Sequence, residues 1–132
     1  MSYASLVIIF NDKNEILLLK RSQKVDSYRG MWGFPGGKRE DGETSVDAAV
    51  REVREETNLK IFPKELAYVF TMKRDSGKDI IFYITNKWSG TPQVDWESDE
   101  YRWFDPFTLS NINIVPAPKI VFELIEAWAK TF

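Results

Sequence analysis

One segment of the chain spaces its apolar residues as a helix does, whereas the apolar runs around it are of strand length. Between Thr44 and Thr57, the residues with helical spacing are Val46, Ala49, Val50, Val53 and Thr57. This spacing places them in a single stripe along a helix. Thr44 and Asp47 can form a capping box at its start, and Asn58 suits the left-handed residue that ends a helix. We therefore expect a helix that covers a sheet built from the flanking strands.

The chain before this helix predicts strands and turns. Residues 6–10 and 16–19 are apolar runs joined by a turn-rich segment, and we expect them to form a buried β-hairpin. The segment Met31 to Gly37 contains Pro35 and paired glycines, which exclude a helix and indicate a tight turn.

The chain after the helix predicts more strands and a second helix. Residues 66–73 and 79–88 flank a turn and indicate another hairpin, and a short strand is expected near residues 101–104. Residues 116–130 carry apolar side chains at helical spacing. The order predicts a mixed α/β (α+β) fold in which a mixed β-sheet is sandwiched between helices. With 132 residues, one domain over residues 1–132 is expected.

The composition limits the chemistry. The chain has neither Cys nor His, which excludes thiolate nucleophiles, zinc–thiolate sites and a Ser–His–Asp triad. Any catalysis must therefore rest on carboxylates. Eighteen basic and 20 acidic residues give a net charge of −2, so the overall charge does not favour a nucleic acid polymer or a membrane as partner. The apolar run at 6–10 is too short for a membrane span or a signal peptide, and we expect a cytoplasmic protein.

Three carboxylates follow one another on the first predicted helix. Glu52, Glu55 and Glu56 have the spacing i, i+3 and i+4, which places them on one side, opposite the apolar stripe. Alone, such a cluster is typical of a solvated face with Arg–Glu pairing. It also offers the oxygen ligands that hard divalent cations prefer.

The residues around this cluster resemble a known motif. Gly37, Glu43 and the run Arg51-Glu52-Val53-Arg54-Glu55-Glu56-Thr57-Asn58-Leu59 match all but one defined position of the Nudix box, GX5EX7REUXEEXGU, where U is aliphatic. The exception is Asn58, where the family has Gly. Asn is the mildest replacement for Gly at a helix end that needs positive φ, so we expect a small loss of stability and unchanged chemistry. The segment Trp32-Gly33-Phe34-Pro35-Gly36-Gly37-Lys38 also resembles the approach to the box in MutT-type members, and Trp103-Phe104 resembles their late strand.

The resemblance implies a Nudix fold and a pyrophosphohydrolase that uses Mg²⁺, with Mn²⁺ as an alternative ion. The implied metal ligands are the carboxylates of Glu52, Glu55 and Glu56 and the carbonyl of Gly37, while Glu43 and Arg51 would form an ion pair that fixes the loop against the helix. Glu97, six residues before Trp103, would be a further ligand or the general base. Whether the base is a box Glu or Glu97 stays open, as does the number of metal ions.

The resemblance also indicates substrate contacts. Arg21 occupies the place of a phosphate-binding Arg in MutT-type members, Arg29 and Lys38 are weaker candidates, and Phe34 would line the base pocket. MutT-type enzymes that act on 8-oxo-dGTP read the purine with an Asn in a Pro-Ala-Asn segment. This chain has Pro116-Ala117-Pro118 there, and Pro118 offers no side-chain donor or acceptor.

These residues favour hydrolysis of a small-molecule nucleoside triphosphate or deoxynucleoside triphosphate to the monophosphate and pyrophosphate. ADP-ribose or a dinucleoside polyphosphate is the alternative substrate. Two other classes of protein are alternatives: a non-catalytic Nudix-fold module that binds a nucleotide, and an interaction domain with an acidic helix. The aromatic content of 14% suits a homodimer interface.

Overall fold

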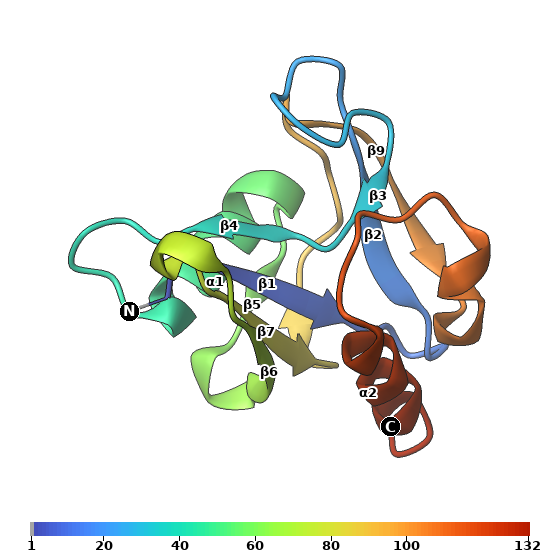
Figure 1. Cartoon of the computed structure of the whole chain (residues 1–132). Coiled ribbons are helices and arrows are strands. Elements are labelled where there is room, and N and C mark those ends of the chain that lie inside the picture. The colour runs from blue at the N-terminus through green and yellow to red at the C-terminus, as the bar shows by residue number, and fades with distance from the viewer. Residues whose placement is uncertain (1) are drawn as a thin grey trace.

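The computed structural model describes residues 2–132 (Figure 1). The strands β1 (Ala4–Ile9), β2 (Ile16–Arg21), β3 (Trp32–Gly33) and β4 (Gly36–Lys38) precede α1 (Ser45–Thr57). The strands β5 (Lys60–Ile61), β6 (Ala67–Met72), β7 (Ile80–Thr85), β8 (Trp88–Ser89) and β9 (Ser98–Phe104) separate α1 from α2 (Lys119–Ala129). Three short 3-10 segments are η1 (Pro63–Glu65), η2 (Asp75–Gly77) and η3 (Pro106–Asn111).

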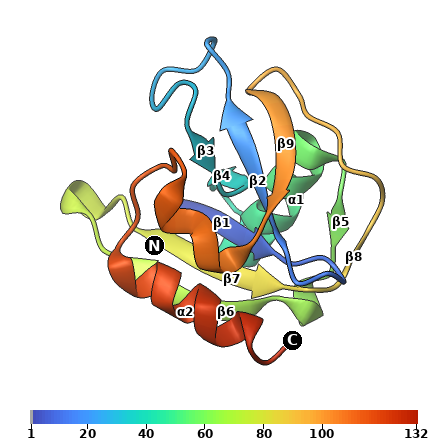
Figure 2. The same ribbon diagram turned by 90° about the vertical axis from the view of Figure 1, so that its right-hand side faces the viewer.

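The larger sheet lies between the two helices. Its order is β4-β1-β7-β6; β1 and β7 are parallel and the other pairs are antiparallel, so the sheet is mixed. Along β1, Ile8 belongs to the apolar cluster that contains Ile125 of α2, whereas Val7 belongs to the one that contains Val53 of α1. Because alternate residues of a strand point to opposite faces, α1 and α2 cover opposite faces of this sheet (Figure 2). The predicted mixed sheet between helices is confirmed.

The first predicted hairpin is wrong in its pairing. Only an isolated bridge joins Phe10 to Ile16 before the two strands separate. β1 continues between β4 and β7, while β2 joins a second sheet of order β3-β2-β9, and a third pair is β5-β8. β1 and β2 are each buried along most of their length. Each is therefore stabilised more by two neighbouring strands of its own than by pairing with the other.

The second hairpin is confirmed, with β6 and β7 antiparallel on either side of η2. Its second strand ends at Thr85, because Trp88 belongs to β8 and pairs with Ile61. α2 starts at Lys119, later than the sequence indicated, because Pro118 adopts an extended N-cap conformation at ψ 142°. No helix in residues 2–132 has the length and apolar character needed to cross a bilayer.

The predicted ends of α1 are confirmed. The Thr44 hydroxyl accepts a hydrogen bond from the Asp47 amide at 3.0 Å, and the Thr44 amide donates to the Asp47 carboxylate at 3.2 Å. At the other end, Asn58 adopts φ 63° and its amide donates to the Arg54 carbonyl at 3.0 Å. These caps fix the register of α1, and with it the direction of its carboxylates.

Candidate functional site

Two adjacent glycines let β4 lie directly on α1. Gly36 has φ 138°, and a Cβ atom there would lie 2.1 Å from the Ser5 carbonyl oxygen. Its amide donates to Glu56 Oε1 at 3.0 Å. A Cβ atom at Gly37 would lie 2.6 Å from the carboxyl carbon of Glu52. The absence of a side chain at Gly36 lets β4 lie against the backbone of β1, and its absence at Gly37 makes room for the Glu52 carboxylate of α1.

The three box carboxylates differ in exposure. Glu55 keeps 55% of its side chain exposed, whereas Glu52 keeps 15% and residue Glu56 only 6%. The solvated face that this spacing alone would indicate is therefore not found for Glu52 and Glu56. The physical reason is that the paired glycines bring β4 over this side of the helix, which the helical spacing alone does not reveal.

Arg51 links the loop after β4 to the helix. Its Nε and Nη2 donate to the two carboxylate oxygens of Glu43 at 2.8 and 2.9 Å, so the ion pair implied by the sequence is present and bidentate. Nη2 also donates to the Lys38 carbonyl, and Nη1 donates to Glu52 at 3.0 Å and to Glu55 at 3.3 Å. One guanidinium thus holds the loop and orients two of the box carboxylates.

The same contacts shift the acidities. The Arg51 guanidinium lowers the pKa of Glu43 to about 2, and Glu43 in turn raises the pKa of Arg51. Burial raises the pKa of Glu56 well above its ordinary value, although the Gly36 amide opposes this shift. Burial also raises the pKa of Glu52, again against the hydrogen bond from Arg51. The site concentrates negative charge that burial makes costly.

Glu97 lies in the loop before β9 and faces the box. Together with Glu56, Gly36, Arg21 and Phe34 it lines a small cavity of about 60 Å³. Burial, with the nearby charge of Asp95 as the second cause, raises the pKa of Glu97. The structure thus places this loop carboxylate and a box carboxylate on one cavity.

Asp95 is a site residue that the sequence analysis missed. Its carboxylate accepts a hydrogen bond from the Glu97 amide at 3.0 Å, and its charge reaches both Glu97 and Glu56. The sequence signal is an acid on either side of Trp96. Of the acids that follow Glu97 in β9, Asp99 is exposed and Glu100 pairs with Arg102 at 2.9 Å.

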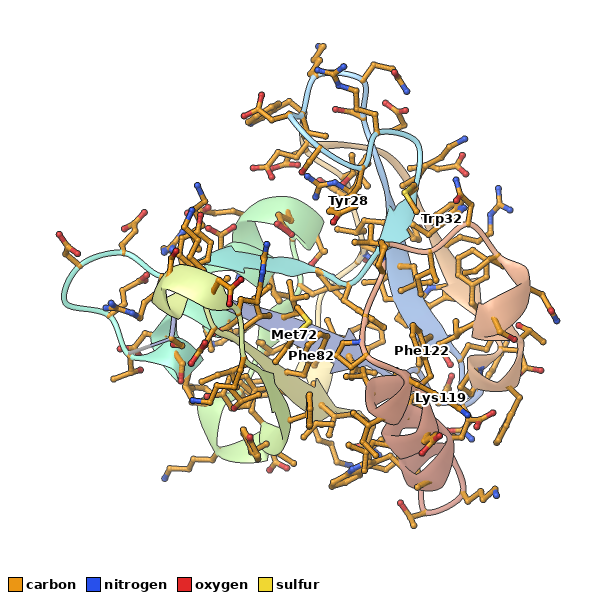
Figure 3. The ribbon with its side chains drawn as sticks, viewed as in Figure 1. Tyr28, Trp32, Met72, Phe82, Lys119 and Phe122 are labelled. Atoms are coloured by element: carbon orange, nitrogen blue, oxygen red, sulfur yellow. The ribbon has the colours of Figure 1, made fainter. Side chains whose placement is uncertain are left out.

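A larger cavity of about 320 Å³ opens beside the small one. Its lining is mostly apolar, with two arginines: Leu6, Arg21, Tyr28, Gly33, Phe34, Met72, Arg74, Ile80, Phe82, Val115, Pro116 and Ala117. The two cavities share Leu6, Arg21, Gly33 and Phe34, so they form one connected site. In Figure 3, Tyr28 lies above Met72 and Phe82, and the three come from the loop after β2, from β6 and from β7.

The four predicted substrate contacts divide into two pairs. Arg21 and Phe34 line both cavities. Arg29 and Lys38 line neither: the Arg29 Nε donates to the Val25 carbonyl at 2.6 Å, and the Lys38 ammonium lies over the ring of Tyr3.

The donor atoms of the site suit a hard cation. The side chains gathered at the small cavity and under β4 supply carboxylate oxygens and no nitrogen or sulfur ligand, which is the chemistry of a Mg²⁺ site. Gly37 provides an opening that a Cβ atom would fill, with the Glu52 carboxylate directly against it. In residues 2–132, no group of three or more acidic side chains has a geometry that could already hold a metal ion. These residues therefore offer the type of ligand atom that Mg²⁺ prefers.

Comparison with known proteins identifies the class. A family model described as NUDIX domain matches residues 2–125. The chain therefore belongs to the Nudix family of hydrolases.

Individual relatives cover most of the chain. It is 36% identical over 117 residues to the 8-oxo-dGTP diphosphatase of Escherichia coli, and the matched region covers 83% of this chain and 84% of that protein. It is 34% identical over 118 residues to the ADP-ribose pyrophosphatase of Methanocaldococcus jannaschii, covering 87% of this chain and 64% of that protein. Other curated relatives are longer, and the match spans 20% of one of them and 10% of another.

A solved structure supports the same assignment. The structure reported for MutT from Aliivibrio salmonicida and Vibrio cholerae superposes with a TM-score of 0.76 at 27% identity, over 100% of both chains.

Proposed function

We propose that this protein is a Mg²⁺-dependent pyrophosphohydrolase that converts a nucleoside or deoxynucleoside triphosphate to the monophosphate and pyrophosphate. The observation that carries the proposal is the junction of an apolar cavity with a smaller one lined by Glu56, Glu97 and Arg21. An apolar space beside convergent charged groups is what a nucleoside with a charged 5′ chain requires.

We assign the parts of the proposed substrate to the two cavities. The base fits the larger cavity, where Phe34 and Phe82 offer aromatic surfaces and Met72 and Ile80 complete an apolar wall. The 5′ phosphates then extend past Arg21, whose guanidinium suits phosphate oxygens. This brings the anhydride to Glu56 and the other carboxylates of the site.

The carboxylates hold the ion and accept the proton. Glu52, Glu55 and Glu56, with the Gly37 carbonyl, are the proposed ligands, and Arg51 keeps the first two oriented. Bound Mg²⁺ would neutralise the phosphates and acidify the attacking water. The water oxygen forms a bond to phosphorus as the bridging P–O bond breaks, and a carboxylate of the small cavity, Glu97 or Glu56, takes the proton.

The relatives support two substrate classes. The 8-oxo-dGTP diphosphatase supports a triphosphate, whereas the ADP-ribose pyrophosphatase supports a nucleoside diphosphate linked to a sugar. The retention of Glu43, Glu52, Glu55 and Glu56 argues against a module that binds without cleaving. We infer the triphosphate as the first choice and ADP-ribose or a dinucleoside polyphosphate as the alternative.

A Mg²⁺ assay over a substrate panel tests the proposal. The panel contains nucleoside and deoxynucleoside triphosphates, oxidised nucleotides, ADP-ribose and dinucleoside polyphosphates, with products identified by chromatography. We expect release of pyrophosphate and a monophosphate from a triphosphate as the fastest reaction. Faster cleavage of ADP-ribose or a dinucleotide would favour the alternative, and no turnover of any compound would contradict the proposal.

Pro118 supplies a test of base recognition. Pro116 and Ala117 line the larger cavity, so the segment lies beside the proposed base. A Pro118→Asn variant would add a donor and an acceptor next to it. We expect a sharp increase in turnover of oxidised dGTP relative to dGTP; an unchanged ratio would contradict the proposed placement of the base.

A further inference from the structure

Three cationic side chains gather at one end of the larger sheet. Lys38 of β4, Lys78 before β7 and Arg74 after β6 form what we call the cationic rim. The ammonium groups of Lys38 and Lys78 each lie 5.5 Å from the centroid of the Tyr3 ring. All three cations are exposed, and no carboxylate in the described part of the chain lies within ion-pair distance of them.

Strand register places the rim beside the larger cavity. Lys38 is directly opposite Ala4 in the antiparallel pair of β4 and β1, so the two share a face of the sheet. Leu6, two residues along β1, lies on the same face and lines the cavity, as does Ile80 of the neighbouring strand. Arg74 itself lines this cavity and does not line the small one. The rim thus borders the larger cavity near Leu6, which both cavities share, and near Ile80 and Arg74, which line the larger cavity alone.

The rim carries an excess of positive charge. Two acids adjoin it along the chain: Asp79 pairs with Lys73 at 3.1 Å and accepts the Arg74 amide, and Asp75, which follows Arg74, offsets one of the three positive charges. The hydrogen bond from Lys38 lowers the pKa of Tyr3, and the charges of Lys38, Lys78 and Arg74 act in the same direction. A protein of net charge −2 therefore presents a local cationic surface at the edge of its cavity.

We propose that the cationic rim binds a phosphate on the 2′ or 3′ carbon of the ribose, so that the site favours nucleotides with a phosphate besides the 5′ chain. The inference rests on the proposed function, which places the base in the larger cavity and the 5′ phosphates at Arg21. The ribose then stands between the two, and its 2′ and 3′ oxygens leave the sugar away from the 5′ chain. Arg74 lines the larger cavity together with Arg21, and Lys78 is a rim cation that lines neither cavity.

Isothermal titration of product-like nucleotides tests this inference without catalysis. The probes are AMP, adenosine 3′,5′-bisphosphate and adenosine 2′,5′-bisphosphate, titrated with Mg²⁺ present, and the guanosine series is run in parallel. None has an anhydride, so none is consumed. We expect one of the two bisphosphates to bind roughly tenfold tighter than the monophosphate, the gain that one charge-assisted contact supplies. The tighter isomer identifies the carbon that bears the phosphate.

A Lys78→Gln variant tests whether the cationic rim causes the tighter binding of the bisphosphate. Lys78 lines neither cavity, so the variant should bind the monophosphate as the wild type does and lose most of the preference for the bisphosphate. The matched control is Lys130→Gln, which removes an exposed lysine at the end of α2 and should keep the preference. Equal melting temperatures would show that both variants are folded.

Three results would overturn the inference. Bisphosphates that bind no tighter than the monophosphate would do so while leaving the proposed function intact. A Lys78→Gln variant that keeps the full preference would show that other residues hold the phosphate. Absence of monophosphate binding in both series would remove the placement of the base, and with it the inference, whereas the hydrolysis assay reports on the proposed function separately.

Discussion

At the residue scale, Gly36 and Gly37 have different roles although they are neighbours. A Cβ atom at Gly36 would meet backbone, the Ser5 carbonyl at 2.1 Å, in a conformation that L residues rarely adopt. A Cβ atom at Gly37 would meet the movable carboxylate of Glu52. The first glycine therefore serves the fold, and the second serves the site.

Alanine substitutions separate these roles. Gly36→Ala should lower the free energy of unfolding by about 3 kcal/mol, since the backbone must shift. Gly37→Ala should leave stability nearly unchanged and reduce turnover about a hundredfold, because a displaced carboxylate misplaces the reacting groups. Urea denaturation and initial rates measure the two effects. Equal loss of stability in both variants would contradict the assignment.

The Glu43–Arg51 ion pair should make the free energy of unfolding depend on pH. The folded pKa of Glu43 is about 2, below its ordinary value of 4.5, so ionised Glu43 stabilises the fold above about pH 4.5 and this contribution is lost as the pH falls toward 2. The difference in unfolding free energy between the wild type and Glu43→Gln should be larger at pH 6 than at pH 3. A difference that does not change between these pH values would show that the pair does not stabilise the fold.

At the scale of elements, α1 could be predicted almost completely from the sequence. Its apolar stripe, its capping box and the positive φ of Asn58 depend on residues close in the chain, and the local pattern contains them all. The pairing of β1 could not be predicted, because its partners β4 and β7 are chosen by burial across the whole sheet. The burial of Glu56 was missed for the same reason, since it depends on β4.

The two ends of α1 give a test at this scale. Thr44→Ala removes one side of the capping box and should cost about 1 kcal/mol. Asn58→Gly relieves a left-handed residue and should stabilise the fold by about 0.5 kcal/mol without changing turnover. Thermal and urea unfolding measure both changes. A marked loss of activity in Asn58→Gly would mean that Asn58 contributes more than a helix end.

At the scale of the whole molecule, the carboxylates of the candidate site are recorded in the sequence more completely than the residues that line the larger cavity. The box residues lie at fixed spacings on one loop and one helix, so a linear pattern records them. The larger cavity draws Tyr28, Met72, Arg74 and Val115 from separate segments, and only the fold brings them together. Arg21 and Phe34 were indicated by the resemblance to MutT-type members, and both line this cavity.

We propose that the buried carboxylates of α1 hold the ion on which hydrolysis depends. The most direct test is the rate of pyrophosphate release as Mg²⁺ is titrated into the wild type, Glu52→Gln and Glu56→Gln, with Glu126→Gln of α2 as the matched control. Gln at position 56 can still accept the Gly36 amide, so the fold should persist. We expect Mg²⁺-dependent turnover in the wild type and the control, and a loss of roughly a thousandfold in the other two variants. Full activity in folded Glu52→Gln or Glu56→Gln, or turnover without a divalent ion, would contradict the account.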